Sequence, residues 1–118
     1  MDKADVVVVG GSAAGLTAAI TVRRHYPDKK VLVVRKEGQV PIPCGIPYIF
    51  GTLGTPQKNL IGDAVLGKNG IELLIAEATD IDREAKVLQT TEGDVGYERL
   101  IVATGSRAAM PPIPGFDL

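Results

Sequence analysis

Four consecutive valines, Val6 to Val9, lead directly into a glycine-rich turn over Gly10 to Gly15, and this junction constrains the fold more than any other part of the chain. A continuous β-branched run that ends at glycine is typical of a strand buried on both faces. The residues from Leu16 to Arg24 predict a helix, and Val31 to Val34 predict a second buried strand. This order of strand, turn, helix and strand indicates an α/β fold with a parallel sheet.

The rest of the chain predicts shorter elements between irregular loops. The segment from Gln39 to Gln57 is rich in proline and glycine, although a short helix is expected to begin near Cys44. Further elements are expected as helical turns over 63–68, strands over 71–75, 80–82 and 87–89, and a final buried strand over 100–103. The short strands and the turns between them predict antiparallel pairing beside the parallel sheet.

The turn after the first strand has the chemistry of a dinucleotide phosphate site. Such a turn needs small residues so that the chain bends sharply, the backbone approaches the pyrophosphate, and the helix packs on the strand. Gly10 and Gly15 occupy the first and third glycine positions, and Ser12 occupies the second, where its hydroxyl is a further donor. Amide groups and the helix dipole then attract the phosphates. The alternative is an ordinary glycine turn of an α/β protein.

The end of the second predicted strand departs from the dinucleotide pattern. That pattern expects an acidic residue about 20 residues after the turn, where it binds a ribose hydroxyl. Arg35 stands there instead, and Glu37 would reach the ribose if the loop shifted. Arg35 is predicted to contact a phosphate or to lie over the adenine, and Lys36 adjoins the same site. The alternative for Arg35 and Lys36 is a solvated strand end.

Composition and charge narrow the class of protein. The 118 residues are 45% hydrophobic and 23% charged, which suits a folded domain with a core. A net charge of −1 gives no reason to expect nucleic acid or an anionic membrane as a partner. The apolar runs are shorter than the roughly 20 residues of a membrane span, and no signal-peptide pattern opens the chain. One cysteine permits no internal disulfide, so a reducing cytoplasm is expected, and one histidine with one cysteine predicts no metal site.

Three motifs together carry a family resemblance. The turn that ends at Gly15, the segment Cys44-Gly45-Ile46-Pro47-Tyr48, and Ala103-Thr104-Gly105 occur in the order found in pyridine nucleotide-disulfide oxidoreductases. The single cysteine followed by Gly-Ile-Pro-Tyr resembles the branch of coenzyme A disulfide reductases and NADH oxidases. The resemblance implies a Rossmann-like, three-layer FAD-binding domain with a parallel sheet and a small antiparallel meander. It also implies FAD as cofactor and NAD(P)H as co-substrate.

The resemblance covers only the front of such an enzyme. Family members are several times longer, so residues 1–118 are expected to form the first segment of the FAD-binding domain. The nicotinamide and dimerisation domains are expected to lie outside this chain, and the full-length protein is expected to be a homodimer. A stand-alone, non-catalytic module that binds FAD or an adenine nucleotide is the alternative.

The resemblance also assigns roles to individual positions. The backbone at Ala78 would meet the adenine edge, and Pro43 stands where the family has an asparagine just before the cysteine. Thr17 and Arg24 match positions that bind coenzyme A. The predicted cofactor residues are thus Gly10, Gly11, Ser12, Ala13, Ala14, Gly15, Arg35, Lys36, Pro43, Ala78, Ala103, Thr104 and Gly105.

Cys44 is the predicted redox centre. The thiolate is the reactive form of cysteine, and a helix N-terminus stabilises it through backbone amides and the helix dipole. Because the chain has no second thiol, the oxidised state would be a mixed disulfide with a small thiol or a sulfenic acid. The first predicts a disulfide reductase, with a substrate such as coenzyme A disulfide, and the second predicts a peroxidase or oxidase. An inert buried cysteine is the alternative.

Overall fold

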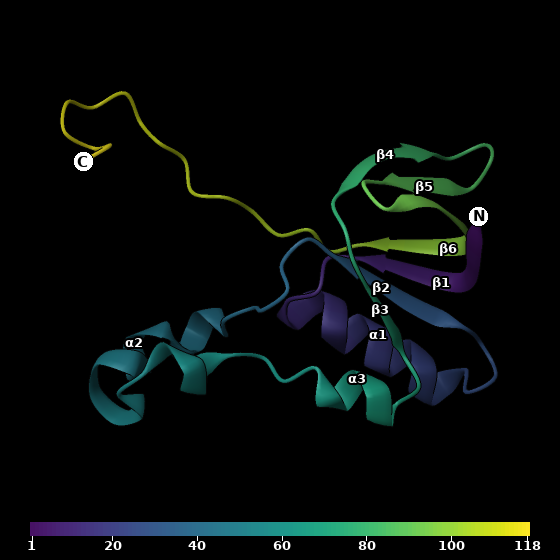
Figure 1. The fold of residues 1–118 in the computed structure, drawn as a ribbon, viewed down its shortest axis with the longest axis horizontal. Coiled ribbons are helices and arrows are strands. Elements are labelled where there is room, and N and C mark those ends of the chain that lie inside the picture. Colours follow the sequence, from purple (N-terminus) through teal and green to yellow (C-terminus); the bar gives the residue numbers. More distant parts are fainter.

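The computed structural model describes residues 1–118 and contains one mixed sheet with helices on one of its faces (Figure 1). The strands are β1 (Asp2–Val9), β2 (Val31–Arg35), β3 (Glu72–Ile75), β4 (Ala78–Asp82), β5 (Val87–Thr90) and β6 (Gly93–Val102). The α-helices are α1 (Ala13–His25), α2 (Ile46–Tyr48) and α3 (Ala64–Lys68). Helix α2 is the middle of a continuous helical run that begins with a 3₁₀ turn, Pro43–Gly45, and ends with a π turn, Ile49–Leu53. A second 3₁₀ turn covers Pro56–Asn59.

The sheet has the order β3-β2-β1-β6-β5-β4. Strand β1 is central and pairs in parallel with both β2 and β6, so that Val7 lies between Leu32 and Leu100. Strand β3 adds in parallel to β2, whereas β4, β5 and β6 form an antiparallel meander. The predicted α/β fold with a parallel sheet and a small meander is confirmed.

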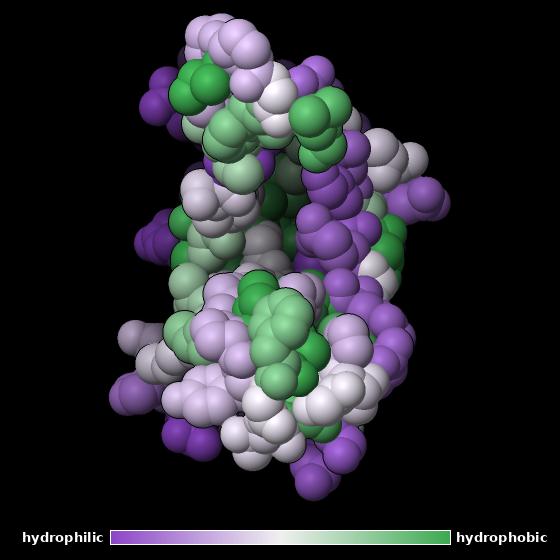
Figure 2. Space-filling view, turned by 90° about the vertical axis from the view of Figure 1, so that its left-hand side faces the viewer, coloured by the Kyte–Doolittle hydropathy of each residue, from purple (hydrophilic) through white to green (hydrophobic).

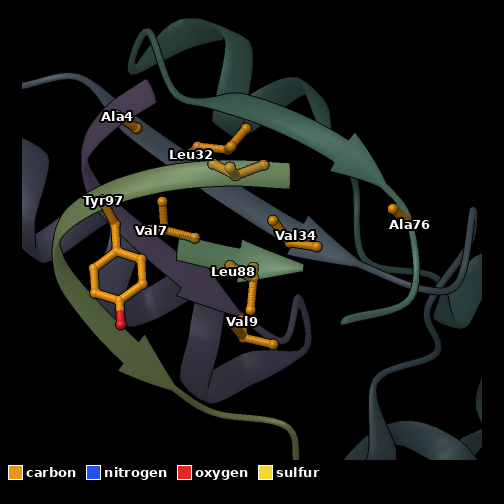
Figure 3. Packing of buried hydrophobic residues seen from close by; sticks show 9 residues of the cluster. Ala4, Val7, Val9, Leu32, Val34, Ala76, Leu88 and Tyr97 are labelled. Atoms are coloured by element: carbon orange, nitrogen blue, oxygen red, sulfur yellow. The ribbon is translucent and has the colours of Figure 1, made fainter. Parts of the chain in front are cut away.

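Two hydrophobic clusters on opposite faces of the parallel strands make three layers. On one face, Val8 and Val33 pack against α1 through Leu16 and Ala19. On the other face, Val7 and Val9 belong to a cluster with Leu88 and Tyr97 of the meander, and Figure 3 shows these side chains gathered over the same part of the sheet. Because both faces of β1 are covered, an unbroken valine run is the pattern that this strand requires.

Strand β6 is longer than the sequence predicted. It begins at Gly93 rather than Leu100, and it includes Asp94 and Gly96, residue types that are depleted in strands. Its first half pairs with β5 while residues from Val95 onward pair with β1. Hydrogen bonds to two neighbours therefore override weak local propensity here.

The topology gathers the loops at one edge of the sheet. The carboxyl ends of β1, β2, β3 and β6 lie at this edge because these strands are parallel. The segment over residues 36–63 leaves β2 there, and the C-terminal tail leaves β6 there (Figure 1). Viewed from this side, the surface is hollowed between the two (Figure 2). None of the helices combines the length and the apolar character needed to cross a membrane.

Candidate functional site

A groove of about 590 Å³ lies at the carboxyl edge of the parallel strands. It brings together residues from five separate parts of the chain: the glycine turn, the end of β2, the start of the cysteine-bearing segment, the start of β4 and the end of β6. Most of the predicted cofactor residues line it, namely Gly10, Gly11, Ser12, Arg35, Lys36, Pro43, Ala78, Ala103, Thr104 and Gly105.

The glycine turn forms where β1, β2 and β6 end together. The amide of Gly10 donates to the carbonyl of Val34 at 2.8 Å, and the amide of Ala103 donates to the carbonyl of Val9 at 2.8 Å. Gly10 has a φ of +112°, and a Cβ there would overlap the carbonyl oxygen of Ala103. A Cβ at Gly15 would in turn overlap the carbonyl of Gly10. Only glycine fits these two positions, because any side chain would overlap neighbouring backbone.

The N-terminus of α1 offers free amide donors beside this turn. The amide of Leu16 is the first in the helix to find a helical acceptor, the carbonyl of Ser12, at 2.9 Å. Ser12 is the N-cap residue, yet its side chain makes no capping bond, and the first turn holds no acidic residue. Ala13 and Ala14 are exposed. This combination of open amides, small side chains and the positive end of a 13-residue helix suits an anionic ligand.

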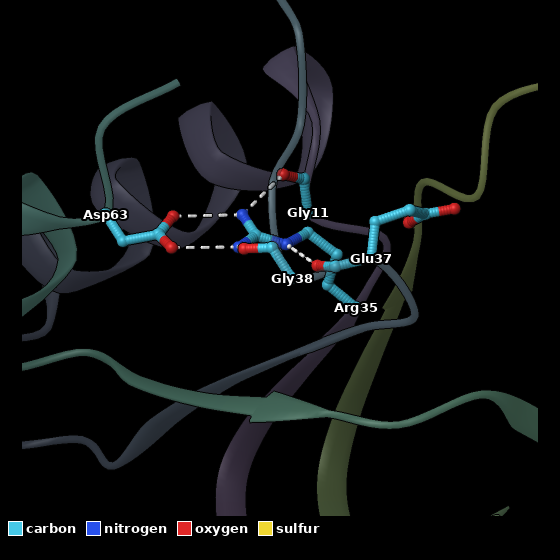
Figure 4. Close-up of polar contacts among 5 residues, drawn as sticks. All are labelled: Gly11, Arg35, Glu37, Gly38 and Asp63. Atoms are coloured by element: carbon cyan, nitrogen blue, oxygen red, sulfur yellow. Dashed lines mark hydrogen bonds and ion pairs between the residues drawn. The ribbon is translucent and has the colours of Figure 1, made fainter. Parts of the chain in front are cut away.

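The Arg35 side chain is buried, with only 1% of its surface exposed, and its guanidinium is fully engaged by the protein. Two parallel bonds of 3.0 and 2.9 Å join it to the carboxylate of Asp63 (Figure 4). Its nitrogens also donate to the carbonyls of Gly11, Glu37 and Gly38. The solvated strand end considered for Arg35 is therefore wrong.

The hydrogen-bond network of Arg35 does not include the side chains of the next two residues, Lys36 and Glu37. The stem of Arg35 packs against Gly11, where a Cβ would overlap it, while the guanidinium is directed at Asp63. The contact of Arg35 with a cofactor stays a prediction. The Glu37 side chain extends away from the network (Figure 4), and both Glu37 and Lys36 line the groove. Glu37 is thus the carboxylate available at the end of β2 for a ligand hydroxyl.

Cys44 is exposed and lies in the 3₁₀ turn, Pro43–Gly45, that opens the cysteine-bearing helical segment. Pro43, the residue before it, is part of the groove wall. The short helix expected near Cys44 is present as the run from Pro43 to Leu53. Cys44 is therefore not the buried cysteine considered from the sequence, and its redox role stays a prediction.

The two predicted coenzyme A positions lie apart from the groove. Thr17 and Arg24 are exposed and sit seven residues apart on α1, so they share one face of that helix. Neither lines the groove. Their role stays a prediction.

A comparison with models of protein families identifies the family of this chain. The model for pyridine nucleotide-disulphide oxidoreductases matches residues 4–118. The chain belongs to this family. The family consists of NAD(P)H-dependent flavoprotein oxidoreductases that use FAD.

Individual members of the family agree with that assignment. The chain is 36% identical, over 98% of its length, to an NAD(P)H coenzyme A polysulfide/persulfide reductase of Pyrococcus horikoshii and covers 27% of that protein. It is 31% identical to an NADH oxidase of Methanocaldococcus jannaschii, covering 95% of this chain and 27% of that one. The solved NAD-dependent persulfide reductase of A. fulgidus has 35% identity and a TM-score of 0.85 over 96% of this chain and 23% of that structure. The chain thus spans about a quarter of the relatives that it matches.

The groove of this family member fits FAD. A diphosphate needs a turn without side chains and free amides at a helix end, and Gly10 and the start of α1 provide both. From the turn, the groove extends to Glu37 and Ala78 at the β2 side and to Thr104 at the β6 side. Several other residues that line the groove, including Val40, Pro41, Ala76 and Ser106, were not singled out from the sequence.

Asp63→Asn tests the energetic role of the Arg35 network. Asparagine removes the carboxylate charge but leaves the three carbonyl acceptors, so we expect the free energy of unfolding to fall by about 2 kcal/mol. The fall is smaller than for a fully buried pair because 41% of the Asp63 side chain is exposed. Urea denaturation followed by circular dichroism measures it.

Glu72→Gln is the control, since Glu72 pairs with Lys30 at 3.8 Å and both side chains are exposed. We expect a change below about 0.5 kcal/mol there. Equal losses in the two variants would show that the Arg35–Asp63 pair behaves as a surface ion pair.

Proposed function

We propose that this chain is the first FAD-binding segment of an NAD(P)H-dependent oxidoreductase that reduces a disulfide, a peroxide or oxygen through Cys44. The observation that carries the proposal is one groove that joins the glycine turn to the start of the cysteine-bearing segment. Pro43 lines this groove and Cys44 follows it in the same helical turn. A cofactor that extends along the groove from the turn would therefore end beside an exposed thiol.

Each part of the groove has a proposed task in holding FAD. The amides of Ser12, Ala13 and Ala14 bind the diphosphate, because they are free and stand at the positive end of α1. The carboxylate of Glu37 accepts a hydrogen bond from a ribose hydroxyl. The backbone at Ala78 contacts the adenine edge, and Thr104 closes over the cofactor from the end of β6.

The chemistry requires Cys44 to form and break one sulfur bond. When bound, FAD supplies two-electron transfer between NAD(P)H and that sulfur. The Cys44 thiolate attacks a disulfide, one thiolate leaves, and a mixed disulfide remains on Cys44. Two electrons then cleave the new bond, which releases the second thiolate and restores that of Cys44. With a peroxide, the products are a sulfenic acid and hydroxide, and two electrons with one proton return the thiolate and water.

A small thiol compound is the substrate class that we favour. The Pyrococcus horikoshii relative is named as a reductase of coenzyme A polysulfide or persulfide. We propose that Thr17 and Arg24, exposed on one face of α1, contact the distal part of a coenzyme A-like substrate. An exposed thiol such as Cys44 suits a reducing compartment, so we propose a cytoplasmic enzyme. The family resemblance supports the proposal that the full-length enzyme is a homodimer.

Ala14→Asp tests the diphosphate site without weakening the fold. An acidic residue in the first turn of α1 favours the helix dipole, so the variant is expected to remain folded. Its charge would stand beside the diphosphate, and we expect FAD affinity to fall at least about 100-fold. Calorimetric titration of the full-length apoprotein with FAD measures this. Ala14→Asn, of equal shape but neutral, is the matched control and should lose far less; equal losses in both would contradict the site.

Cys44→Ser tests the redox role. Cys44 comes directly after the groove residue Pro43 in the sequence but does not itself line the groove. We therefore expect the full-length variant to bind FAD as the wild type does. Oxidation of NAD(P)H by a disulfide substrate should fall by a factor of at least about 1,000, since a hydroxyl cannot form the sulfur bond. Stopped-flow absorbance follows both the flavin and the nicotinamide. Unchanged turnover with disulfide, peroxide and oxygen alike would end the proposal for Cys44.

A further inference from the structure

Asn59 is a buried polar residue that touches the turn carrying Cys44. Only 2% of its surface is exposed, and its side-chain amide donates to the carbonyl of Ile42 at 3.0 Å. The same carbonyl accepts the amide of Gly45 at 2.9 Å, the bond that closes the turn around Cys44. Asn59 therefore holds the acceptor on which the conformation of this turn depends.

Position 45 needs a glycine because of its contact with Asn59, and not because of its backbone conformation. Its φ of −88° and ψ of −11° are accessible to any residue. A Cβ at this position, however, would overlap the side-chain oxygen of Asn59. The amide group of Asn59 thus occupies the space in which a side chain at position 45 would lie, directly after Cys44 in the chain.

The backbone of Asn59 is fixed as firmly as its side chain. The amide of Ile42 donates to the carbonyl of Asn59 at 2.8 Å, and the amide of Ile61 donates to the carbonyl of Val40 at 2.7 Å. Pro41 and Leu60 form an antiparallel bridge between these bonds. The two ends of the cysteine-bearing loop are therefore joined next to the groove, on whose wall Val40 and Pro41 also lie.

We propose that Asn59 is a positioning residue for Cys44: by bonding Ile42 and packing on Gly45, it sets where the thiol stands relative to the groove. The proposal rests on the proposed function, in which FAD in the groove ends beside Cys44. None of the chemistry passes through Asn59. A displacement of about 1 Å at a reacting atom is enough to cost a large factor in rate, which makes such a residue functionally important.

The degree to which bound FAD protects Cys44 from alkylation reports where the thiol stands relative to the groove. Full-length protein is treated with iodoacetamide with and without saturating FAD, and the alkylation rate of the Cys44 peptide is followed by mass spectrometry. In the wild type we expect bound FAD to slow alkylation about tenfold or more. In Asn59→Ala the turn is released, and we expect the ratio of the two rates to fall to within about twofold of one. A purely structural residue would lower the melting temperature and leave this ratio unchanged.

Asn69→Ala is the matched control, because its side-chain amide also donates to a backbone carbonyl, that of Val65 at 2.7 Å, but at the end of α3. It should keep the wild-type ratio. Wild-type protection that persists in a folded, FAD-saturated Asn59→Ala protein would overturn the inference alone. No protection in the wild type would instead overturn the placement of FAD beside Cys44, which is the proposed function.

A second variant keeps the test decisive if Asn59→Ala does not fold. Gly45→Ala pushes against Asn59 from the other side and should also reduce protection. The methyl group would overlap the side-chain oxygen of Asn59 and displace it from the turn. Full protection by FAD in a folded Gly45→Ala protein would contradict the matched pair.

Discussion

The approach of Gly10 to the carbonyl of Ala103 is the contact on which the rest of the site depends. It is made where the central strand β1 ends beside β6, and it leaves no room for a side chain. The same turn lets Gly15 bring α1 onto the backbone of Gly10. As a result, the helix begins at the edge of the sheet, and its N-cap residue, Ser12, lines the groove. Both the three-layer packing and the proposed diphosphate site follow from this crowding of backbone against backbone.

The buried cation of Arg35 is a second constraint, and it links the groove to the loop that carries Cys44. Its Nη1 donates to the carbonyl of Gly11 in the glycine turn, and Nη1 and Nη2 together donate to the carboxylate of Asp63 at the far end of the loop. A cation so deeply buried requires such partners. Arg35 stands where a ribose-binding acid was expected, and these contacts give it a structural role. Glu37 supplies a carboxylate to the groove instead.

Much of this architecture could be predicted because its causes are local. Valine runs, a glycine turn and an apolar helix face specify β1, α1 and β2, and the turn itself indicated phosphate chemistry. The contacts of Arg35 with Asp63 and of Gly45 with Asn59 could not be predicted, since they join residues far apart in the sequence through side chains with no spacing rule. The early start of β6 was missed for the same physical reason: pairing with β5 and β1, and not residue type, makes Gly93 to Gly96 a strand.

A crystal structure of the full-length protein with FAD would locate the cofactor relative to the glycine turn and the thiol together. We expect the diphosphate within hydrogen-bond distance of the amides of Ser12 to Ala14, the ribose beside Glu37, and the flavin ring against Cys44. A diphosphate bound elsewhere, or a flavin ring remote from Cys44, would contradict the proposed placement of FAD.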